Sequence, residues 1–329
     1  MLKKSINLAA LPHVALGLAL WFSGGAAQAQ TAYVSNERGN TVTVIDVAKA
    51  SVKATWAVGH RPRGIVATPD GRQVLVAVGQ DSAVEQRDAA SGALIASLAS
   101  GQDPEQIFLS RDSHTLFASN EDDAAASAID LARREVAWQV AVGKDPEGIA
   151  QSPDGKQLVV TSEDGNTLSF VDVASRQVTD TLTTPARPRH VEYTADGREL
   201  WVAAELGSEV DVVDPARHTI TTRIAFAPPG VQPYKVMPCG IRFSPDGKLA
   251  AVALGRANHI ALVDVAAHTV LAYVPVGARP WHLAFTPDGQ TILVANGMSD
   301  EVAFVDVASR KVRARVPAGS GPWGIVVVP

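Results

Sequence analysis

One motif recurs along this chain at a fixed interval. An aspartate that ends a strand-like segment returns every 42 residues, with a single interval of 50. These positions are Asp46, Asp88, Asp130, Asp172, Asp214, Asp264 and Asp306. Loop prolines follow the same register at Pro62, Pro104, Pro146, Pro188, Pro238, Pro280 and Pro322. Turn aspartates do so at Asp70, Asp112, Asp154, Asp196, Asp246 and Asp288. Three markers in one register identify a repeat protein.

Each repeat contains four short segments of alternating apolar and polar residues. Residues 41–47 and 51–58 form two of them, and residues 65–69 begin the next repeat. Turns such as Ser244-Pro245-Asp246-Gly247 separate the first and second segments, because proline and glycine suit the two special positions of a tight turn. This organisation predicts the four-stranded antiparallel blade of a β-propeller.

The two ends of the chain predict how the ring closes. Residues 324–329 match a first strand and stop where its turn would begin, whereas the N-terminal repeat starts at its second strand, at Tyr33. Six whole repeats and one split repeat give an all-β, seven-bladed propeller whose last blade is closed by N- and C-terminal strands together. Such closure hides both exposed sheet edges. We therefore expect a single domain over residues 30–329.

The first 29 residues are typical of a signal peptide. Lys3 and Lys4 precede an apolar run from Ile6 to Phe22, and Ala27-Gln28-Ala29 offers a cleavage site. A membrane anchor is the alternative, but Pro12 and His13 interrupt a run that is already short for a membrane span. We expect cleavage after Ala29, export to the periplasm, and no membrane attachment of the mature protein.

Composition excludes some classes of function. The formal net charge is −5 and there is no basic run, so the chain is a poor candidate for binding nucleic acid. The single cysteine, Cys239, excludes an intramolecular disulfide and the two-cysteine pattern of heme attachment.

The repeats resemble those of the YVTN family of β-propellers. The resemblance is carried by Ala32-Tyr33-Val34-Ser35-Asn36, by Ile45-Asp46-Val47 and by the Pro-Asp-Gly turns. It implies a relation to periplasmic propellers associated with pyrroloquinoline-quinone (PQQ)-dependent catabolism. The tryptophans do not recur from blade to blade as in the quinoprotein dehydrogenases, so the resemblance does not imply that this chain is the dehydrogenase or binds the quinone itself.

Departures from the repeat indicate where a site lies. The loops with the recurring proline and the loops between second and third strands should share one face, around the mouth of the central channel. We number the blades 1 to 7 in the order of their loop prolines, from Pro62 to Pro322. The candidate binding residues in these loops are Arg61, Arg63, Glu105, Glu121, Glu147, Glu163, Arg187, Arg189, His190, Cys239, Arg279, Trp281, His282 and Trp323.

The predicted mouth is divided into sectors. Blades 2 and 3 are rich in carboxylates, and blades 1, 4 and 6 supply arginines. The acidic sector suits a basic partner or a cation, with ordinary solvated loops as the alternative. The arginines suit a small anionic ligand, unless they pair with the neighbouring acids across the ring.

Two further features are candidates for function. An eight-residue insertion before Pro238 predicts a lid over the mouth, formed by Pro229, Tyr234, Lys235 and Met237. His190, Cys239 and His282 are the one plausible set of transition-metal ligands, although no short-range spacing supports them.

From these observations we expect a monomeric periplasmic binding protein rather than an enzyme, with no cofactor of its own. Its predicted partner at the mouth is a quinoprotein dehydrogenase, a cytochrome or a small anionic ligand. One alternative is a lactonase-type hydrolase that uses His190, Arg189 and Glu147 or Glu205 for acid–base chemistry. The other is a metal-binding chaperone.

Overall fold

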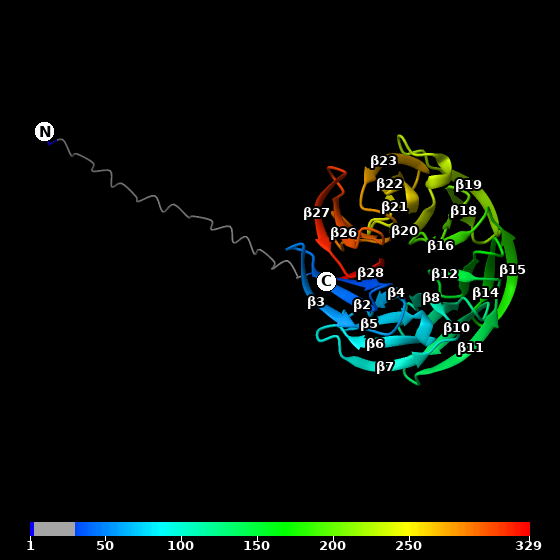
Figure 1. Cartoon of the computed structure of the whole chain (residues 1–329). Helices are drawn as coiled ribbons and strands as arrows, with labels where there is room; N and C mark the ends of the chain where they lie inside the picture. Colours follow the sequence, from blue (N-terminus) through cyan, green and yellow to red (C-terminus); the bar gives the residue numbers. More distant parts are fainter. Residues whose placement is uncertain (3–29) are drawn as a thin grey trace.

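Seven four-stranded antiparallel sheets surround a central axis in the computed structural model, which describes residues 1–2 and 30–329 (Figure 1). The predicted seven-bladed propeller is confirmed. The predicted signal peptide falls almost wholly outside the described residues. Among the described residues, no helix is long and apolar enough to cross a membrane.

Within each blade the strands follow one another from the axis outward. The inner strands are β28 (Pro322–Val328), β4 (Pro62–Ala67), β8 (Pro104–Leu109), β12 (Pro146–Gln151), β16 (Pro188–Tyr193), β20 (Pro238–Phe243) and β24 (Pro280–Phe285). The second strands are β1 (Thr31–Asn36), β5 (Gln73–Val78), β9 (Thr115–Asn120), β13 (Gln157–Ser162), β17 (Leu200–Ala204), β21 (Leu249–Leu254) and β25 (Thr291–Asn296). The third strands are β2 (Thr41–Asp46), β6 (Ala83–Asp88), β10 (Ala125–Asp130), β14 (Thr167–Asp172), β18 (Glu209–Asp214), β22 (His259–Asp264) and β26 (Glu301–Asp306). The outer strands are β3 (Ser51–Ala57), β7 (Leu94–Ala99), β11 (Glu135–Ala141), β15 (Gln177–Thr183), β19 (Thr219–Ala225), β23 (Thr269–Pro275) and β27 (Lys311–Pro317). In residues 30–329 the short 3-10 helices are η1 (Gly79–Asp81), η2 (Pro233–Lys235) and η3 (Gly255–Ala257).

The seventh blade joins the two ends of the chain, as predicted. Its sheet has the order β28-β1-β2-β3, and Thr31 pairs with Val328 at one end of the β1–β28 ladder. The C-terminus therefore lies beside the first described strand (Figure 1). Because the C-terminal strand β28 pairs with β1, backbone hydrogen bonds between the two ends of the chain close the ring.

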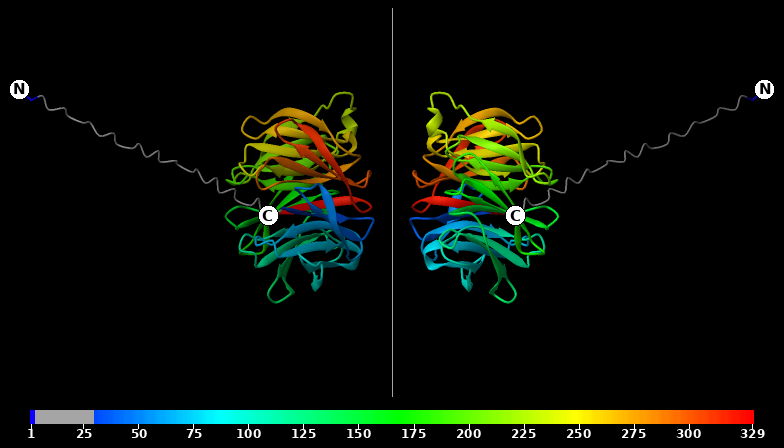
Figure 2. Two further views of the ribbon diagram at one scale, coloured as in Figure 1. Left: turned by 90° about the vertical axis from the view of Figure 1, so that its left-hand side faces the viewer. Right: turned by 90° about the vertical axis from the view of Figure 1, so that its right-hand side faces the viewer.

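The core lies between neighbouring blades. Second and third strands are buried along nearly their whole length, whereas outer strands alternate between exposed and half-buried positions. Trp201 and Val212 of blade 4, for example, share one apolar cluster with Ile241 of blade 5. Side views show these sheets stacked around the axis as a thick disc (Figure 2). Since each blade buries its faces only against its neighbours, the blades position one another and the loops at the mouth.

Candidate functional site

A β-bulge follows the loop proline in the inner strand of every blade. In blade 1, for instance, Pro62 pairs with Val78 but Ile65 pairs with Val76, so one extra residue is accommodated between them. The same register shift occurs in the other six blades. Bulges redirect side chains. Here the bulge sets the direction of the residues just after the proline, which include the candidates Arg63, Glu105 and Arg189.

Arg61 and Arg63 of blade 1 bind the carboxylates of blade 2. Arg61 lies 2.6 Å from Glu105 and 3.4 Å from Glu121, and it also makes a close contact with Asp103. Arg63 pairs with Glu105 as well, and the side chain of Glu105 is fully buried. Two guanidinium groups thus share one carboxylate that has no access to water.

Blades 3, 4 and 6 form the other half of the network. Arg189 is 6% exposed and lies 3.0–3.3 Å from three carboxylates, those of Glu147, Glu163 and Glu205. Arg279 reaches across from blade 6 to Glu205, at 2.6 Å, and Arg187 lies 2.6 Å from Glu163. The arginines of the predicted sectors are therefore not free charges. They pair with the neighbouring acids across the ring, which was the alternative reading of the sequence.

Carboxylates nevertheless outnumber arginines in this network. Arg61, Arg63, Arg187, Arg189 and Arg279 are paired with Glu37, Asp103, Glu105, Glu121, Glu147, Glu163 and Glu205. Burial, together with the neighbouring Glu147 carboxylate, raises the pKa of Glu163 to about 7 and that of Glu105 well above its usual range. Burial also raises the pKa of Asp103. These shifts are the expected response of crowded carboxylates that lack enough cations.

The network surrounds a cavity of about 320 Å³ on the mouth face. We call it the mouth cavity. It is lined by Arg61, Arg63, Glu121, Glu147, Glu163, Arg187, Arg189, Glu205, Met237, Arg256, Arg279 and Trp281. Trp281 lies beneath two guanidinium groups, 4.0 Å from that of Arg279 and 5.0 Å from that of Arg189. Most predicted binding residues thus meet in one place, as the repeat register requires.

Glycines make room for this network. The β21–β22 loop carries Gly255 at the repeat position where blade 4 has Glu205, and a Cβ there would lie 2.5 Å from Nη1 of Arg279. Gly297 of blade 6 is equivalent, and a Cβ there would lie 2.5 Å from the Trp281 ring. Glutamate occupies this repeat position in blades 2, 3, 4 and 7 and glycine in blades 1, 5 and 6, a sequence signal that points to the same network.

Four of the predicted residues lie below the mouth. His190, His282 and Trp323 are at most 8% exposed, and none of them lines the mouth cavity. Trp323 packs against His282, with ring centroids 4.2 Å apart. Cys239 is 1% exposed, and its thiol donates to the Met237 carbonyl oxygen.

Gln106, His190 and His282 meet on the axis and form what we call the polar plug. Nδ1 of His190 lies 3.2 Å from Oε1 of Gln106, and Nε2 of His282 lies 3.5 Å from Nε2 of Gln106. The two imidazole rings are 5.3 Å apart. Burial lowers the pKa of both histidines, and the neighbouring cationic groups lower that of His282 further. Both imidazoles are therefore neutral at pH 7.

The plug has a repeat signature that sequence reasoning missed. Its three residues occupy the same position in blades 2, 4 and 6, and glycine fills that position in the other blades, at Gly64, Gly148, Gly240 and Gly324. These glycines lie against the backbone of the next inner strand. A Cβ on Gly148, for example, would lie 2.8 Å from the Arg189 carbonyl oxygen. Seven large side chains would not fit around the axis, so bulky and small residues alternate.

A second cavity, of about 450 Å³, lies on the other side of the plug. It shares no lining residue with the mouth cavity. Its polar residues include His190, Glu192 and Arg242, and Nε2 of His190 lies 3.3 Å from Oε2 of Glu192. The predicted catalytic set is thus divided, since Arg189, Glu147 and Glu205 belong to the mouth while His190 faces the opposite cavity.

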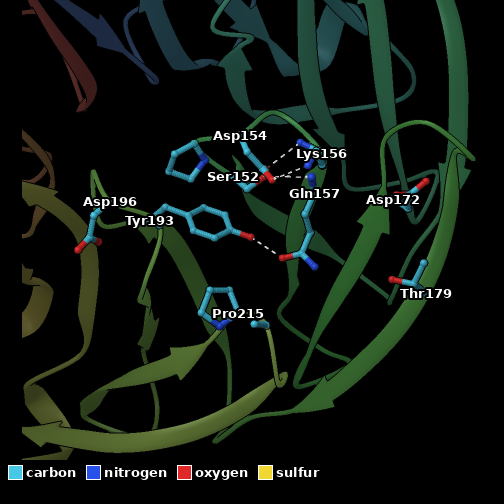
Figure 3. A pocket seen from close by; sticks show the side chains of 12 residues that line it. Ser152, Asp154, Lys156, Gln157, Asp172, Thr179, Tyr193, Asp196 and Pro215 are labelled. Carbon is cyan, nitrogen blue, oxygen red and sulfur yellow. Dashed lines mark hydrogen bonds and ion pairs between the residues drawn. The ribbon is translucent and has the colours of Figure 1, made fainter.

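A third cavity is a groove between blades 3 and 4 at their turns, of about 480 Å³ (Figure 3). Tyr193 donates a hydrogen bond to Gln157 across this groove, at 2.7 Å (Figure 3). No candidate residue from the sequence lines it. It joins two blades and lies away from the mouth.

The three predicted metal ligands do not suit one metal site. His190 and His282 adjoin, but burial raises the pKa of Cys239 to about 12, so this thiol stays protonated and is a poor metal ligand. Within the described residues, the three-residue cluster with metal-like spacing is Asp103, Glu105 and Glu121. Arg61 already pairs with each of its members.

The insertion before β20 lies beside the mouth. Tyr234 and Lys235 belong to η2 and are exposed, as is Pro229, whereas Met237 lines the mouth cavity with its sulfur 3.8 Å from Arg279. Val236 is fully buried in the cluster between blades 4 and 5. The loop (yellow-green) lies toward the outer edge of the ring in Figure 1. Of the four predicted lid residues, Met237 alone reaches the cavity.

Comparison with known proteins places this chain among β-propellers. Hydrazine synthase of Kuenenia stuttgartiensis superposes with a TM-score of 0.77 at 23% identity, over 84% of this chain and 92% of that one. The periplasmic gluconolactonase of Pseudomonas aeruginosa gives a TM-score of 0.77 at 23% identity, over 92% and 99% of the two chains. A putative 6-phosphogluconolactonase of Bacteroides uniformis gives 0.76 at 17% identity, over 92% and 100%.

At these identities the similar structures establish the fold alone. No curated protein matches the sequence. The sequence does match the YNCE-like beta-propeller family over residues 18–183 and 165–327, and the chain belongs to that family.

Proposed function

We propose that this chain is a binding protein whose mouth face docks a basic protein partner. The observation that carries the proposal is that the ion-paired mouth network holds seven carboxylates and five arginines, while Arg256, which also lines the cavity, is exposed. A lysine or arginine side chain of a partner would supply the missing positive charge. Buried like charges destabilise a fold unless a counter-charge is provided, so docking and the network would stabilise each other.

The rim extends this acidic character. Asp122, Asp123 and Asp164 are exposed on blades 2 and 3, in loops that adjoin Glu121 and Glu163. A partner with a basic patch is therefore attracted to this sector over a distance of about one Debye length.

Exposed apolar side chains border the other half of the mouth. Leu206, Tyr234 and Met298 are 58–71% exposed and lie in mouth-face loops of blades 4, 5 and 6. Isolated exposed apolar residues are common, but three in adjacent blades provide anchors that small anions do not need. They favour a protein partner over a small ligand.

The setting of this function is proposed from the sequence. From the predicted signal peptide we propose a periplasmic location, and from the resemblance to YVTN repeats a role beside quinone-linked oxidation, with a dehydrogenase or a cytochrome as partner. The arginines of the mouth network are already paired with carboxylates, so the proposal includes no PQQ site at the mouth.

Binding of a basic c-type cytochrome, used as a probe, tests the proposal. We expect saturable binding that weakens as salt is added. We expect the triple variant Asp122→Asn/Asp123→Asn/Asp164→Asn to bind about tenfold more weakly. The control Asp154→Asn/Asp196→Asn/Asp246→Asn removes the same charge from the opposite face. Equal affinity of the two triple variants, or insensitivity to salt, would contradict docking at the mouth.

A lactonase is the second candidate, favoured by the full-length structural similarity to a protein described as a periplasmic gluconolactonase. The mouth supplies Glu147, Glu205 and Arg189 for this chemistry. His190 is part of the plug and lines the opposite cavity. Proton release from gluconolactone tests it. Activity that Glu147→Gln abolishes and His190→Ala leaves intact would replace the binding proposal with an enzyme at the mouth.

A further inference from the structure

We infer that the cavity below the polar plug is a second binding site, for a small monocarboxylate with an apolar body. This cavity opens on the face opposite the mouth and is independent of the proposed docking function. Its volume of about 450 Å³ lies in the range of small-molecule sites in proteins.

The cavity is closed at its inner end by the plug. Gln106 and His190 belong to its lining, and His282 lies directly behind Gln106. Since the two cavities share no lining residue, a ligand entering from the turn face stops at this layer. The site is therefore a blind pocket rather than part of an open channel.

Its walls are mostly apolar. Side chains from the inner strands of five blades line it, namely Val66, Ile107, Phe108, Ile149, Val191 and Val326. Walls of this kind bury the body of an aliphatic or aromatic ligand, at about 25 cal/mol for each Å² of apolar surface removed from water.

One charged pair breaks the apolar wall. Nη1 of Arg242 contacts Oε2 of Glu192, and within residues 30–329 this is the one ion-pair partner of the Arg242 side chain. The Arg242 side chain is 39% exposed. Arg242 therefore keeps guanidinium donors that are directed at neither Glu192 nor another described acid, and a carboxylate is the group they bind best.

The balance of charge favours an anion over a cation. Besides Arg242, the lining contains Arg111 at the rim, and Glu192 is its one acid. Despite its burial, the Arg242 guanidinium and the His190 imidazole lower the pKa of Glu192, so this carboxylate is ionised and already engaged. The pocket thus carries a net positive charge of one beside apolar walls, which matches an amphipathic monoanion.

Calorimetric titration of the mature protein with octanoate tests this inference, and 1-octanol is the uncharged probe of similar shape. We expect octanoate to bind with one-to-one stoichiometry and octanol to bind at least about tenfold more weakly. Arg242→Gln should reduce octanoate affinity about tenfold or more, the usual value of a charge-assisted hydrogen bond. Arg223→Gln is the matched control, because Arg223 pairs with Glu209 and Asp211 away from this cavity.

A second variant separates the cavity from its rim. Ala67→Phe places a ring among the lining residues without changing charge, and it should abolish octanoate binding. Three results would overturn the inference: no heat of binding at millimolar octanoate, equal binding of octanol, or unchanged affinity in Arg242→Gln. Retained affinity in Ala67→Phe would place the anion on the surface and would also refute the pocket.

Discussion

At the scale of single residues, the mouth depends on buried arginines that each serve several carboxylates. Arg189 is the most enclosed of them, with Glu147, Glu163 and Glu205 around it. Buried ion pairs gain little over a well-packed apolar core, but removal of one partner leaves uncompensated charge behind. The network is therefore sensitive to loss of its cations and less so to loss of a surplus carboxylate.

Arg189→Met tests this sensitivity. It removes the guanidinium while keeping the volume of the side chain, and it should lower the free energy of unfolding by about 3–5 kcal/mol at pH 7. Urea denaturation measures the effect. The matched control Arg72→Met alters an arginine that is 84% exposed and whose partner Asp70 is also exposed, so it should cost less than about 1 kcal/mol. A similar loss of unfolding free energy in both variants would show that the cost of removing an arginine here does not depend on its burial.

Glu163 should give the fold a dependence on pH. Burial and Glu147 raise its folded pKa from 4.5 to about 7, so the folded state holds this proton more tightly than the unfolded state. Its contribution to stability is complete below pH 4.5 and is lost as pH rises through 7. Glu163→Gln lacks this titration. Denaturation of both proteins at steps from pH 4.5 to 8 should show the wild type losing up to about 3 kcal/mol relative to the variant. A constant difference across this range would refute the raised pKa.

At the scale of elements, glycines set the distance between neighbouring inner strands. Gly64, Gly148, Gly240 and Gly324 let one inner strand approach the backbone of the next, and the intervening blades 2, 4 and 6 fill the axis with Gln106, His190 and His282. Backbone atoms cannot move aside as a flexible side chain can. The alternation therefore fixes both the distance between blades and the position of the plug.

Gly148→Ala tests the spacing. Its methyl group would lie 2.8 Å from the Arg189 carbonyl oxygen and 3.0 Å from Cα of His190, so we expect a loss of about 1–3 kcal/mol through overpacking. Gly165→Ala is the control, because its closest neighbours are the side chains of Thr167 and Ser162 at 3.2–3.3 Å. Equal unfolding midpoints for the two variants would mean that the inner strands separate without cost.

At the scale of the whole molecule, closure of the ring holds the mouth together. The network joins blades 1, 2, 3, 4, 6 and 7, and the strand that completes blade 7 comes from the other end of the chain. Loss of that strand exposes the edge of β1 and of the neighbouring blades.

Truncation after Ser320 removes β28 and should abolish the single cooperative unfolding transition. It takes away the buried side chains of Trp323 and Ile325, each worth about 1.5–3 kcal/mol, as well as the β1–β28 ladder. A circular permutant is the control. It joins Pro329 to Gln30 by a short linker and has new ends between Arg111 and Asp112, and its melting temperature should stay within a few degrees of the wild type. Calorimetry that shows a cooperative transition in the truncated chain would contradict the role of closure.

The architecture was predictable because it is repeated. Asp46 and its six equivalents, the loop prolines and the split first repeat specify the number of blades, their four strands and the shared seventh blade without any long-range contact being known. The bulge after each proline then sets the direction of equivalent residues, so most candidates at the mouth could be named in advance.

What the tertiary structure decided is which of those residues meet, and through which groups. Repeat register locates a residue along the central axis with an uncertainty of about one residue. That uncertainty matters here, because Arg189 lines the mouth cavity and the next residue, His190, belongs to the plug. Repeat register does not show that Arg279 of blade 6 reaches past blade 5 to Glu205 of blade 4. Nor does it show that Glu192 and Arg242 face a separate cavity, or that Met237 is the one predicted lid residue that reaches the mouth. These contacts depend on side-chain lengths and on the curvature of a closed ring. Both are set only when all seven blades are packed together.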